Sequence, residues 1–472
     1  MIERQVARKK IELELKLASL AEELQSWCDR SAKDKIFEKH NTQIRALQAH
    51  LNGWRASIKK RLEKYNNQAP DLYLTNCANA EKIILSEHRI WDYFRSRLIQ
   101  REEDSFLPYL RAADEFAWHC YQPILEIVYP DVISSPAKQP PLVFFNGGIS
   151  PFSLSRGKSF QPEQVAGEVL NINPDEYITK LPIPVVGVPW NQVSHLPAVL
   201  VLGHEVGHIV EDDFGLETEL KLMLKNALEQ RKADETRTKA WNEWLGEIFA
   251  DLYGCLAAGP AFAGALIDFI AKGKQTICSE AKIAPDWGRY PTDFLRVRII
   301  LKALELMGFD KSPAALEYRE LWDFYSSGMD KAYTEDVPVI VKALLEGKHP
   351  VLGNKSIREV FSFSDDQQKA VEDLVQKFSK TRLDTNVEIP SKDIRVLFAA
   401  LRRAFETDPD KYKKSKYGEA VLTHIAKKVI QKGVRAGEVK LDGAKLNKKL
   451  KVYESSGADL VESLFAAAEK KP

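Results

Sequence analysis

Two regular stripes of apolar residues stand at the start of the chain. Apolar side chains from Leu13 to Trp27 are separated by steps of four and three, and the same spacing returns from Ile44 to Ile58. Such steps place side chains on one face of a helix. The first 66 residues or so therefore predict a coiled-coil-like helical hairpin. We expect the two stripes to pack on each other, with pairing of two chains through the same stripes as the alternative.

The middle of the chain has a different pattern. Helix is expected from about residue 78 to residue 128, followed by a section rich in proline and glycine. Within it, the short apolar runs Leu142–Phe145 and Ile183–Val188 predict strands. Prolines around the second run indicate an edge strand, to which an extended peptide could add. From Ser194 to the end of the chain the pattern is again mainly helical.

These patterns predict a fold that is mainly α with a small β-sheet, in the α+β class. We divide the chain into an N-terminal helical hairpin (residues 1–68), a core (residues 69–350) and a C-terminal helical, basic region (residues 351–472).

Composition narrows the class of protein. The chain has 472 residues, of which 44% are hydrophobic, and its formal net charge of +1 predicts no polyanion partner for the whole molecule. Residues 411–451 carry 13 Lys and Arg against 3 Asp and Glu, but no nucleic-acid-binding signature accompanies them, so nucleic acid is an unlikely partner. Five scattered cysteines, no apolar leader and no apolar run of membrane-spanning length predict a cytoplasmic protein that does not cross a membrane.

The candidate chemistry begins at His204-Glu205-Val206-Gly207-His208, an HExxH motif. In a helix, residues four apart lie on the same face, so His204 and His208 can direct ring nitrogens to one metal ion. Glu205 is placed to bond to a metal-bound water. The alternative is a pair of hydrogen-bonded core histidines. Ser194 is expected to cap this helix, with Pro197 in its first turn.

A zinc site needs a third protein ligand. The positions three and six residues after His208 hold Glu211 and Phe214, which excludes the extended motif with a third histidine. The best candidates lie on the next helix-like run, where Glu243, Glu247 and Asp251 are spaced by four. A row of acids that points inward is costly unless it meets a cation.

The arrangement HEVGH followed 39 residues later by Glu247-Ile-Phe-Ala-Asp251 resembles the HExxH…ExxxD pattern of gluzincin zinc metallopeptidases, over about residues 183–260. The resemblance implies a zincin-like catalytic core with one zinc ion per chain. It implies that His204, His208 and Glu247 bind zinc, that Glu205 is the general base, and that Asp251 orients a zinc-bound histidine, with His204 as the expected one. A similarity to aspzincins, in which Asp251 would be the ligand, ranks second, and Glu243 as the ligand ranks third.

Hydrolysis of a peptide bond also needs a donor for the oxyanion that forms. In gluzincins a His, Tyr or Arg from a later segment commonly serves, and the run Gly288–Ile299 offers Tyr290 and Arg296 as catalytic residues. Arg298 and His349 are weaker alternatives.

Two functional hypotheses follow. The first is a zinc-dependent metallopeptidase that acts on peptide or protein substrates, with a possible regulatory protein partner on the N-terminal hairpin or the C-terminal helices. The second is a helical interaction or regulatory protein in which the zinc site is structural or inactive.

Overall fold

The computed structural model describes residues 1–33, 35–130, 138–157, 159–160, 179–280, 288–325, 331–380, 389–430 and 443–469. Over these residues the chain is mainly helical, with short strands only, as the hydrophobic pattern predicts. The division of the chain at residues 68 and 350 stays a prediction. No helix in the described part of the chain is both long enough and apolar enough to cross a membrane.

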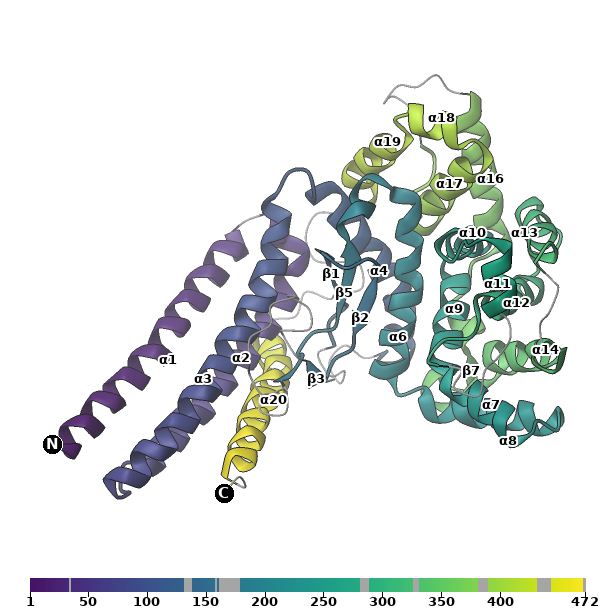
Figure 1. Ribbon diagram of the computed structural model, residues 1–472. Coiled ribbons are helices and arrows are strands. Elements are labelled where there is room, and N and C mark those ends of the chain that lie inside the picture. Colours follow the sequence, from purple (N-terminus) through teal and green to yellow (C-terminus); the bar gives the residue numbers. More distant parts are fainter. Residues whose placement is uncertain are drawn as a thin grey trace.

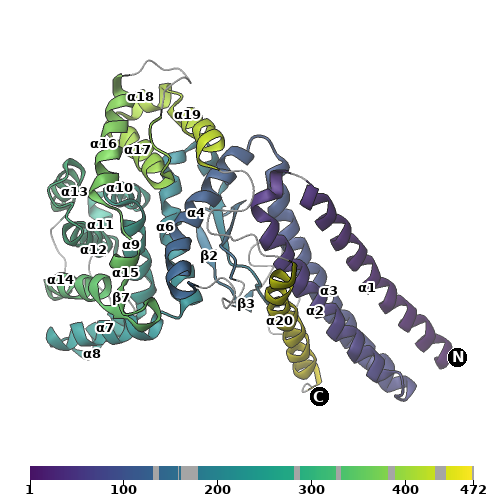
Figure 2. The same cartoon turned by 180° about the vertical axis from the view of Figure 1, so that it is seen from behind.

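The N-terminal helices form an elongated bundle on one side of the molecule (Figure 1, Figure 2). The hairpin of α1 (Ile2–Lys33) and α2 (Asn41–Tyr65) is present, and every residue of both apolar stripes is buried. The stripes do not pack on each other alone, because α3 (Pro70–Leu98) contacts both helices and α20 (Gly443–Glu469) lies along α2. We call these four helices the four-helix bundle.

The crossing of α2 and α20 requires glycine. A Cβ atom at Gly53 would overlap the backbone of Glu454, and one at Gly457 would overlap the carbonyl oxygen of His50. Only residues without a side chain let the two backbones approach this closely. The last described helix therefore packs on the second helix of the chain.

A three-stranded sheet separates the bundle from the rest of the molecule. It contains β1 (Leu142–Asn146), β5 (Val185–Pro189) and β2 (Phe152–Leu154), in the order β1-β5-β2. Side chains of β1 and β5 alternate between a core shared with the bundle and a core shared with the helices behind it. Because both faces are covered, the two strands are continuous apolar runs, as is usual for buried strands.

The prediction that the second apolar run forms an edge strand is wrong. β5 is the central strand, parallel to β1 and antiparallel to β2. The prolines lie at its ends, where Pro184 precedes the strand and Pro189 is its last residue, so they cost no central ladder hydrogen bond. The strand at the edge beside the following helices is β2.

The other elements form a large helical body behind the sheet (Figure 1). Its helices up to residue 346 are α4 (Leu107–Val128), α6 (Leu202–Phe214), α7 (Glu217–Gln230), α8 (Glu235–Glu243), α9 (Leu245–Ala258), α10 (Pro260–Phe269), α11 (Lys274–Glu280), α12 (Asp293–Leu306), α13 (Pro313–Asp323) and α14 (Lys331–Glu346). They are followed by α15 (Ile357–Val360), α16 (Asp365–Lys380), α17 (Ile394–Thr407), α18 (Pro409–Lys414) and α19 (Tyr417–His424). Two-residue strands pair as β3 (Ser159–Phe160) with β4 (Thr179–Lys180) and as β6 (Lys348–His349) with β7 (Lys355–Ser356).

Short 3₁₀ and π turns complete the described chain. The 3₁₀ turns are η1 (Lys35–His40), η2 (Ile99–Glu102), η4 (Trp190–Ser194), η5 (Leu196–Val201) and η6 (Pro350–Leu352), and η7 (Ile425–Val429) is a π turn.

Two local predictions differ from the structure. The helix that carries HEVGH begins at Leu202 after η5, so Ser194 does not cap it and Pro197 lies in the 3₁₀ turn instead. The expected acidic helix is divided at Trp244, which ends α8 and precedes α9. The large Trp244 side chain is fully buried, and this tertiary contact overrides the continuous helical pattern.

Candidate metal centre

Two glycines bring α6 and α9 close together. A Cβ atom at Gly207 would lie 2.9 Å from Cβ of Tyr253 and 3.0 Å from Cα of Ala250, and one at Gly203 would lie 3.1 Å from Cβ of Ala257. Since both glycines face α9, the backbones can pack with little between them. This close packing places the histidines of α6 against the acids of α9.

His204, His208 and Glu247 form one cluster. Nε2 of His204 lies 3.2 Å from Nε2 of His208. Oε2 of Glu247 lies 3.4 Å from Nε2 of His204 and 3.5 Å from Nε2 of His208. His204 and Glu247 are buried and His208 is half-buried. One potential ligand atom from each residue thus faces the same small space, within 4.8 Å of the other two.

A chain of hydrogen bonds lies behind His204. Oδ1 of Asp251 is 2.8 Å from Nδ1 of His204, which must donate because a carboxylate only accepts. Arg296 in turn donates from Nε and Nη2 to the two oxygens of Asp251, each over 2.8 Å. A proton held on Nδ1 leaves the lone pair of Nε2 directed towards the cluster, which is the tautomer that a metal ligand needs.

The pKa values show how strongly the site attracts positive charge. Burial alone would lower the pKa of His204, but its contacts with Asp251 and Glu247 outweigh burial and raise the pKa to about 9. Burial would raise the pKa of Glu247, but the two imidazoles lower it well below its usual range. Burial would also raise the pKa of Asp251, but its contacts with Arg296 and, to a smaller extent, with His204 lower it. Without a cation, a proton on His204 balances part of the negative charge.

The residues present fit a metal ion. Two imidazole nitrogens and one carboxylate oxygen are a donor set that zinc uses in sites that keep a fourth position open. Oε2 of Glu247 is buried and makes no hydrogen bond with any described residue, although it faces the histidines. A buried carboxylate oxygen without a partner is costly. A cation between the three residues would satisfy it.

A cavity of about 380 Å³ opens beside the cluster. Glu205 and His204 form part of its wall, and Glu205 is buried. The other lining residues are Ser150, Pro151, Val201, Phe262, Leu266, Phe269, Ile270, Lys272, Tyr290, Asp293 and Arg296. The volume is within the range of small-ligand sites, and the lining from α10 is apolar. A molecule that enters this cavity therefore reaches His204 of the cluster and the neighbouring Glu205.

Both proposed oxyanion donors line the cavity, but they differ in solvent exposure and in hydrogen bonding. Tyr290 is 52% exposed at its wall, whereas Arg296 is 6% exposed and bonded to Asp251. Burial, Glu247 and Glu205 raise the pKa of Tyr290, so its hydroxyl stays a donor at neutral pH.

The alternatives lie elsewhere. Arg298 donates to Asp323 over 2.9 Å, and His349 is a buried residue of β6; neither lines the cavity. Glu243 is an exposed residue at the end of α8 and is not part of the cluster.

The C-terminal end of α6 is held by Asp213. Tyr121 of α4 donates to its Oδ2 over 2.7 Å, and Nε of Arg156 lies 3.3 Å from its Oδ1. Nη1 of Arg156 also donates to the hydroxyl oxygen of Tyr453 on α20, over 2.9 Å. The helix with the HExxH motif is thus joined through two side chains to the last described helix.

Sequence reasoning missed two parts of this site. The apolar wall from Phe262 to Ile270 looks like ordinary core in the sequence, because nothing local shows which face of α10 meets a cavity. Arg289, whose Nε lies 3.1 Å from Oε1 of Glu247, was also missed. The only available signal was its place beside Tyr290 in the run that supplies Arg296.

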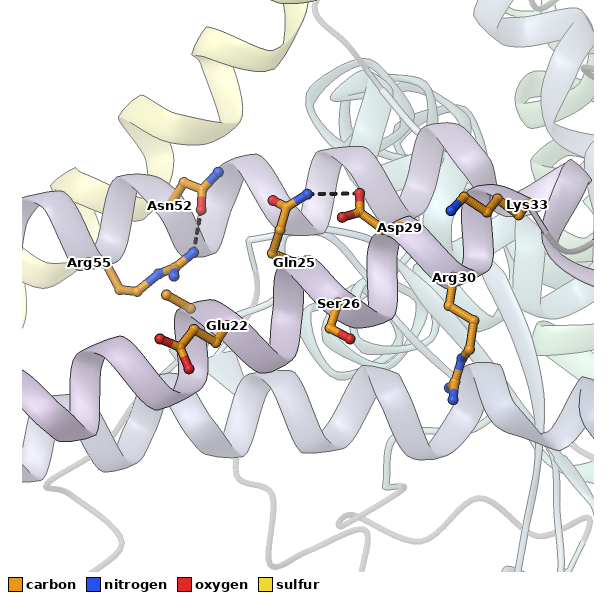
Figure 3. Close-up of a pocket in the computed structure, with 9 residues that line it drawn as sticks. Glu22, Gln25, Ser26, Asp29, Arg30, Lys33, Asn52 and Arg55 are labelled. Carbon is orange, nitrogen blue, oxygen red and sulfur yellow. Dashed lines mark hydrogen bonds between the residues drawn. The ribbon is translucent and has the colours of Figure 1, made fainter.

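A second hollow, of about 890 Å³, lies between α1 and α2 of the four-helix bundle (Figure 3). Its polar side chains bond to one another: Gln25 donates to Asp29 over 2.9 Å, and Arg55 donates to Asn52. Among the described residues that line it there is no histidine or cysteine. This hollow therefore offers no comparable chemistry.

Comparison with known proteins gives no family: no family model, no curated protein and no solved structure matches the chain.

Proposed function

We propose that the chain is a zinc-dependent metallopeptidase with a zincin-like core. The observation that carries the proposal is the buried, unbonded Oε2 of Glu247, which faces the nitrogens of His204 and His208 beside an open cavity. A purely structural metal site is usually closed by four protein ligands. Here three donors converge among the described residues, and one of them, His204, lines the cavity together with Glu205.

In this proposal the residues of the site have separate roles in metal binding, proton transfer and ligand orientation. His204, His208 and Glu247 would hold zinc, which supplies polarisation of the substrate carbonyl and a lowered pKa of water when bound. Glu205, in the cavity wall, accepts the proton of the attacking water and passes it to the leaving amine. Asp251 keeps His204 in the required tautomer.

The transition state needs a further donor. The exposed, protonated hydroxyl of Tyr290 is the better placed of the two candidates, because Arg296 is buried and its Nε and Nη2 bond to Asp251. Arg296 also lines the cavity, so it stays the second candidate.

The substrate in this proposal is a peptide or protein segment in an extended conformation. One edge of β2 pairs with β5, no other described strand pairs with β2, and Ser150 and Pro151 just before it line the cavity. Main-chain pairing with β2 would direct one substrate side chain into the apolar wall of α10. Action in the cytoplasm and recruitment by a protein partner on the bundle helices are further parts of the proposal.

The test compares Glu205→Gln with wild type, both purified without a metal-affinity tag. Zinc content is measured by elemental analysis, and cleavage is measured on a mixture of peptides from a digested proteome. We expect about one zinc ion per chain in both proteins and a loss of cleavage of at least about 100-fold in the variant. Glu211→Gln, on the same helix but outside the cavity lining, is the matched control.

Equal cleavage by Glu205→Gln and wild type would contradict the peptidase proposal. Zinc bound in both proteins without any cleavage would favour the alternative of a helical interaction protein with an inactive site.

A further inference from the structure

The segment before α12 brings an exposed arginine to a buried metal ligand. Nε of Arg289 lies 3.1 Å from Oε1 of Glu247. The side chain of Arg289 is 73% exposed, and that of Glu247 is 3% exposed. The guanidinium carbon of Arg289 also lies 5.8 Å from the centre of the Tyr290 ring. The side chain of Arg289 thus contacts both Tyr290 in the cavity wall and Glu247 in the metal cluster.

The two oxygens of Glu247 have different surroundings. Oε2 faces the nitrogens of His204 and His208 and has no hydrogen-bond partner among the described residues. Oε1 faces the guanidinium group of Arg289. A carboxylate can meet a cation through one oxygen or through both. The guanidinium group beside Oε1 disfavours metal binding through this oxygen, because its positive charge repels a second cation there.

We infer that Arg289 is a positioning residue that restricts Glu247 to metal binding through Oε2 alone. A single oxygen from Glu247 leaves the remaining position of the metal open to water or substrate, which hydrolysis requires. The inference rests on the proposed metal site but not on peptidase activity. Arg289 thereby gives the described residues just before α12 a part in metal binding, although none of them belongs to the His204, His208 and Glu247 cluster.

Arg296 makes a useful contrast. It is 6% exposed and donates two hydrogen bonds to buried Asp251, so its removal would leave a buried carboxylate without its partner. Variants of Arg296 would report on folding as well as on the site. Arg289 is mostly solvated, so its removal changes the site with little effect on stability.

The experiment uses the full chain, stripped of metal with a chelator and titrated with cobalt(II). The visible absorption of bound cobalt reports its coordination number, and competition with a chelator gives the dissociation constant. Arg289→Ala and Arg289→Lys are compared with wild type. Arg298→Ala, which removes an arginine of α12 that pairs with Asp323, is the control.

We expect Arg289→Ala to bind cobalt about fivefold more tightly, because a repelling positive charge is removed from the site and Oε1 becomes available as a second ligand atom. Its absorption spectrum should change towards higher coordination, because Oε1 is released. Arg289→Lys should restore part of both properties, and Arg298→Ala should match wild type.

A spectrum and dissociation constant of Arg289→Ala equal to those of wild type would overturn the inference while leaving the metal site standing. A wild-type protein that binds neither cobalt nor zinc would overturn the inference and the proposed function together.

Discussion

The helix pairs α6/α9 and α2/α20 both rely on glycine where they cross, but they differ in what they enclose. Gly203 and Gly207 let α6 approach α9, and the interface contains two histidines and two acids in one connected cluster. Gly53 and Gly457 let α2 approach α20, and the neighbouring core is mainly apolar. Close packing at glycine therefore forms a candidate metal site in one place and closes a helical bundle in the other.

The sequence signals of the two pairs also differ. Histidines four apart and acids four apart mark α6/α9 within a short stretch of chain. The α2/α20 pair joins residues about 400 positions apart, such as Ser57, whose Oγ donates to Glu462 over 2.8 Å. No local sequence motif predicts that α2 packs on α20.

The largest effect is expected from Gly207→Val. A side chain there meets Tyr253 and Ala250 at about 3 Å, so α9 must move away and take Glu247 with it. We expect a loss of about 3 kcal/mol in unfolding free energy, as for a severe overpacking change. Zinc content should fall with it. Denaturant unfolding with a chelator present, together with elemental analysis, measures both.

Gly246→Ala is the matched control on α9. Its Cβ atom would lie 3.5 Å from Oε2 of Glu211, an ordinary contact, and alanine favours a helix by up to about 1 kcal/mol. If Gly207→Val is as stable and as zinc-rich as this control, close packing of α6 on α9 does not hold the site.

A smaller and more local effect is expected from Gly457→Val. Its side chain would overlap the carbonyl oxygen of His50, so α20 should leave α2. We expect cleavage of α20 by an added protease to become at least about tenfold faster, equivalent to about 1.4 kcal/mol in local opening. Zinc content should stay near the wild-type level, because Tyr121 still holds Asp213 at the end of α6.

Ser456→Val, at the exposed neighbouring position of α20, controls for the added side chain. Loss of zinc in Gly457→Val but not in this control would show that the two helix pairs are coupled, and would contradict the independence expected here.

The third effect depends on pH and comes from a carboxyl group in the bundle. Glu87 of α3 is fully buried, with Nε of Arg55 3.3 Å from its Oε1. Burial raises its pKa to about 8 although Arg55 opposes the shift, whereas 4.5 is the ordinary value. Between these values the folded protein binds a proton that the unfolded chain has released. Stability should therefore fall as the pH rises from about 4.5 to about 8, by at most ~1.4 kcal/mol per pH unit.

Glu87→Gln removes the titrating group and should remove this slope. Denaturant midpoints of wild type and variant at pH 5, 6, 7 and 8 measure it as a difference between the two proteins. Parallel pH profiles would show that Glu87 does not titrate in this range. The carboxylates of the candidate metal centre supply the contrast, because Glu247 and Asp251 have lowered pKa values and stay ionised throughout.

Much of the fold follows from the chain's periodicity. The two N-terminal stripes and the strands β1 and β5 lie where the pattern predicts them. The pattern could not show that β5 is central, because strand order depends on which segments meet in space. It also could not show that α3 and α20 share the apolar stripes of the hairpin.

The candidate site could likewise be predicted from the sequence only in part. Residue spacing alone placed His204 with His208 and Glu247 with Asp251, since each pair lies one helical turn apart. It could not choose among the three acids spaced by four. The tertiary structure decides it: Glu243 ends α8 in solvent beside the buried Trp244, and Asp251 bonds to Nδ1 of His204, which leaves Glu247 in the cluster.

By itself, therefore, the sequence determined the donor atoms and their spacing along each helix, because helical geometry is local and repeats every 3.6 residues. Only the tertiary structure decided that α6 faces α9, that Arg289 faces Oε1 of Glu247 and that a cavity opens beside Glu205. Those relations depend on the packing of distant segments, where a glycine or a buried tryptophan sets distances that no local pattern contains.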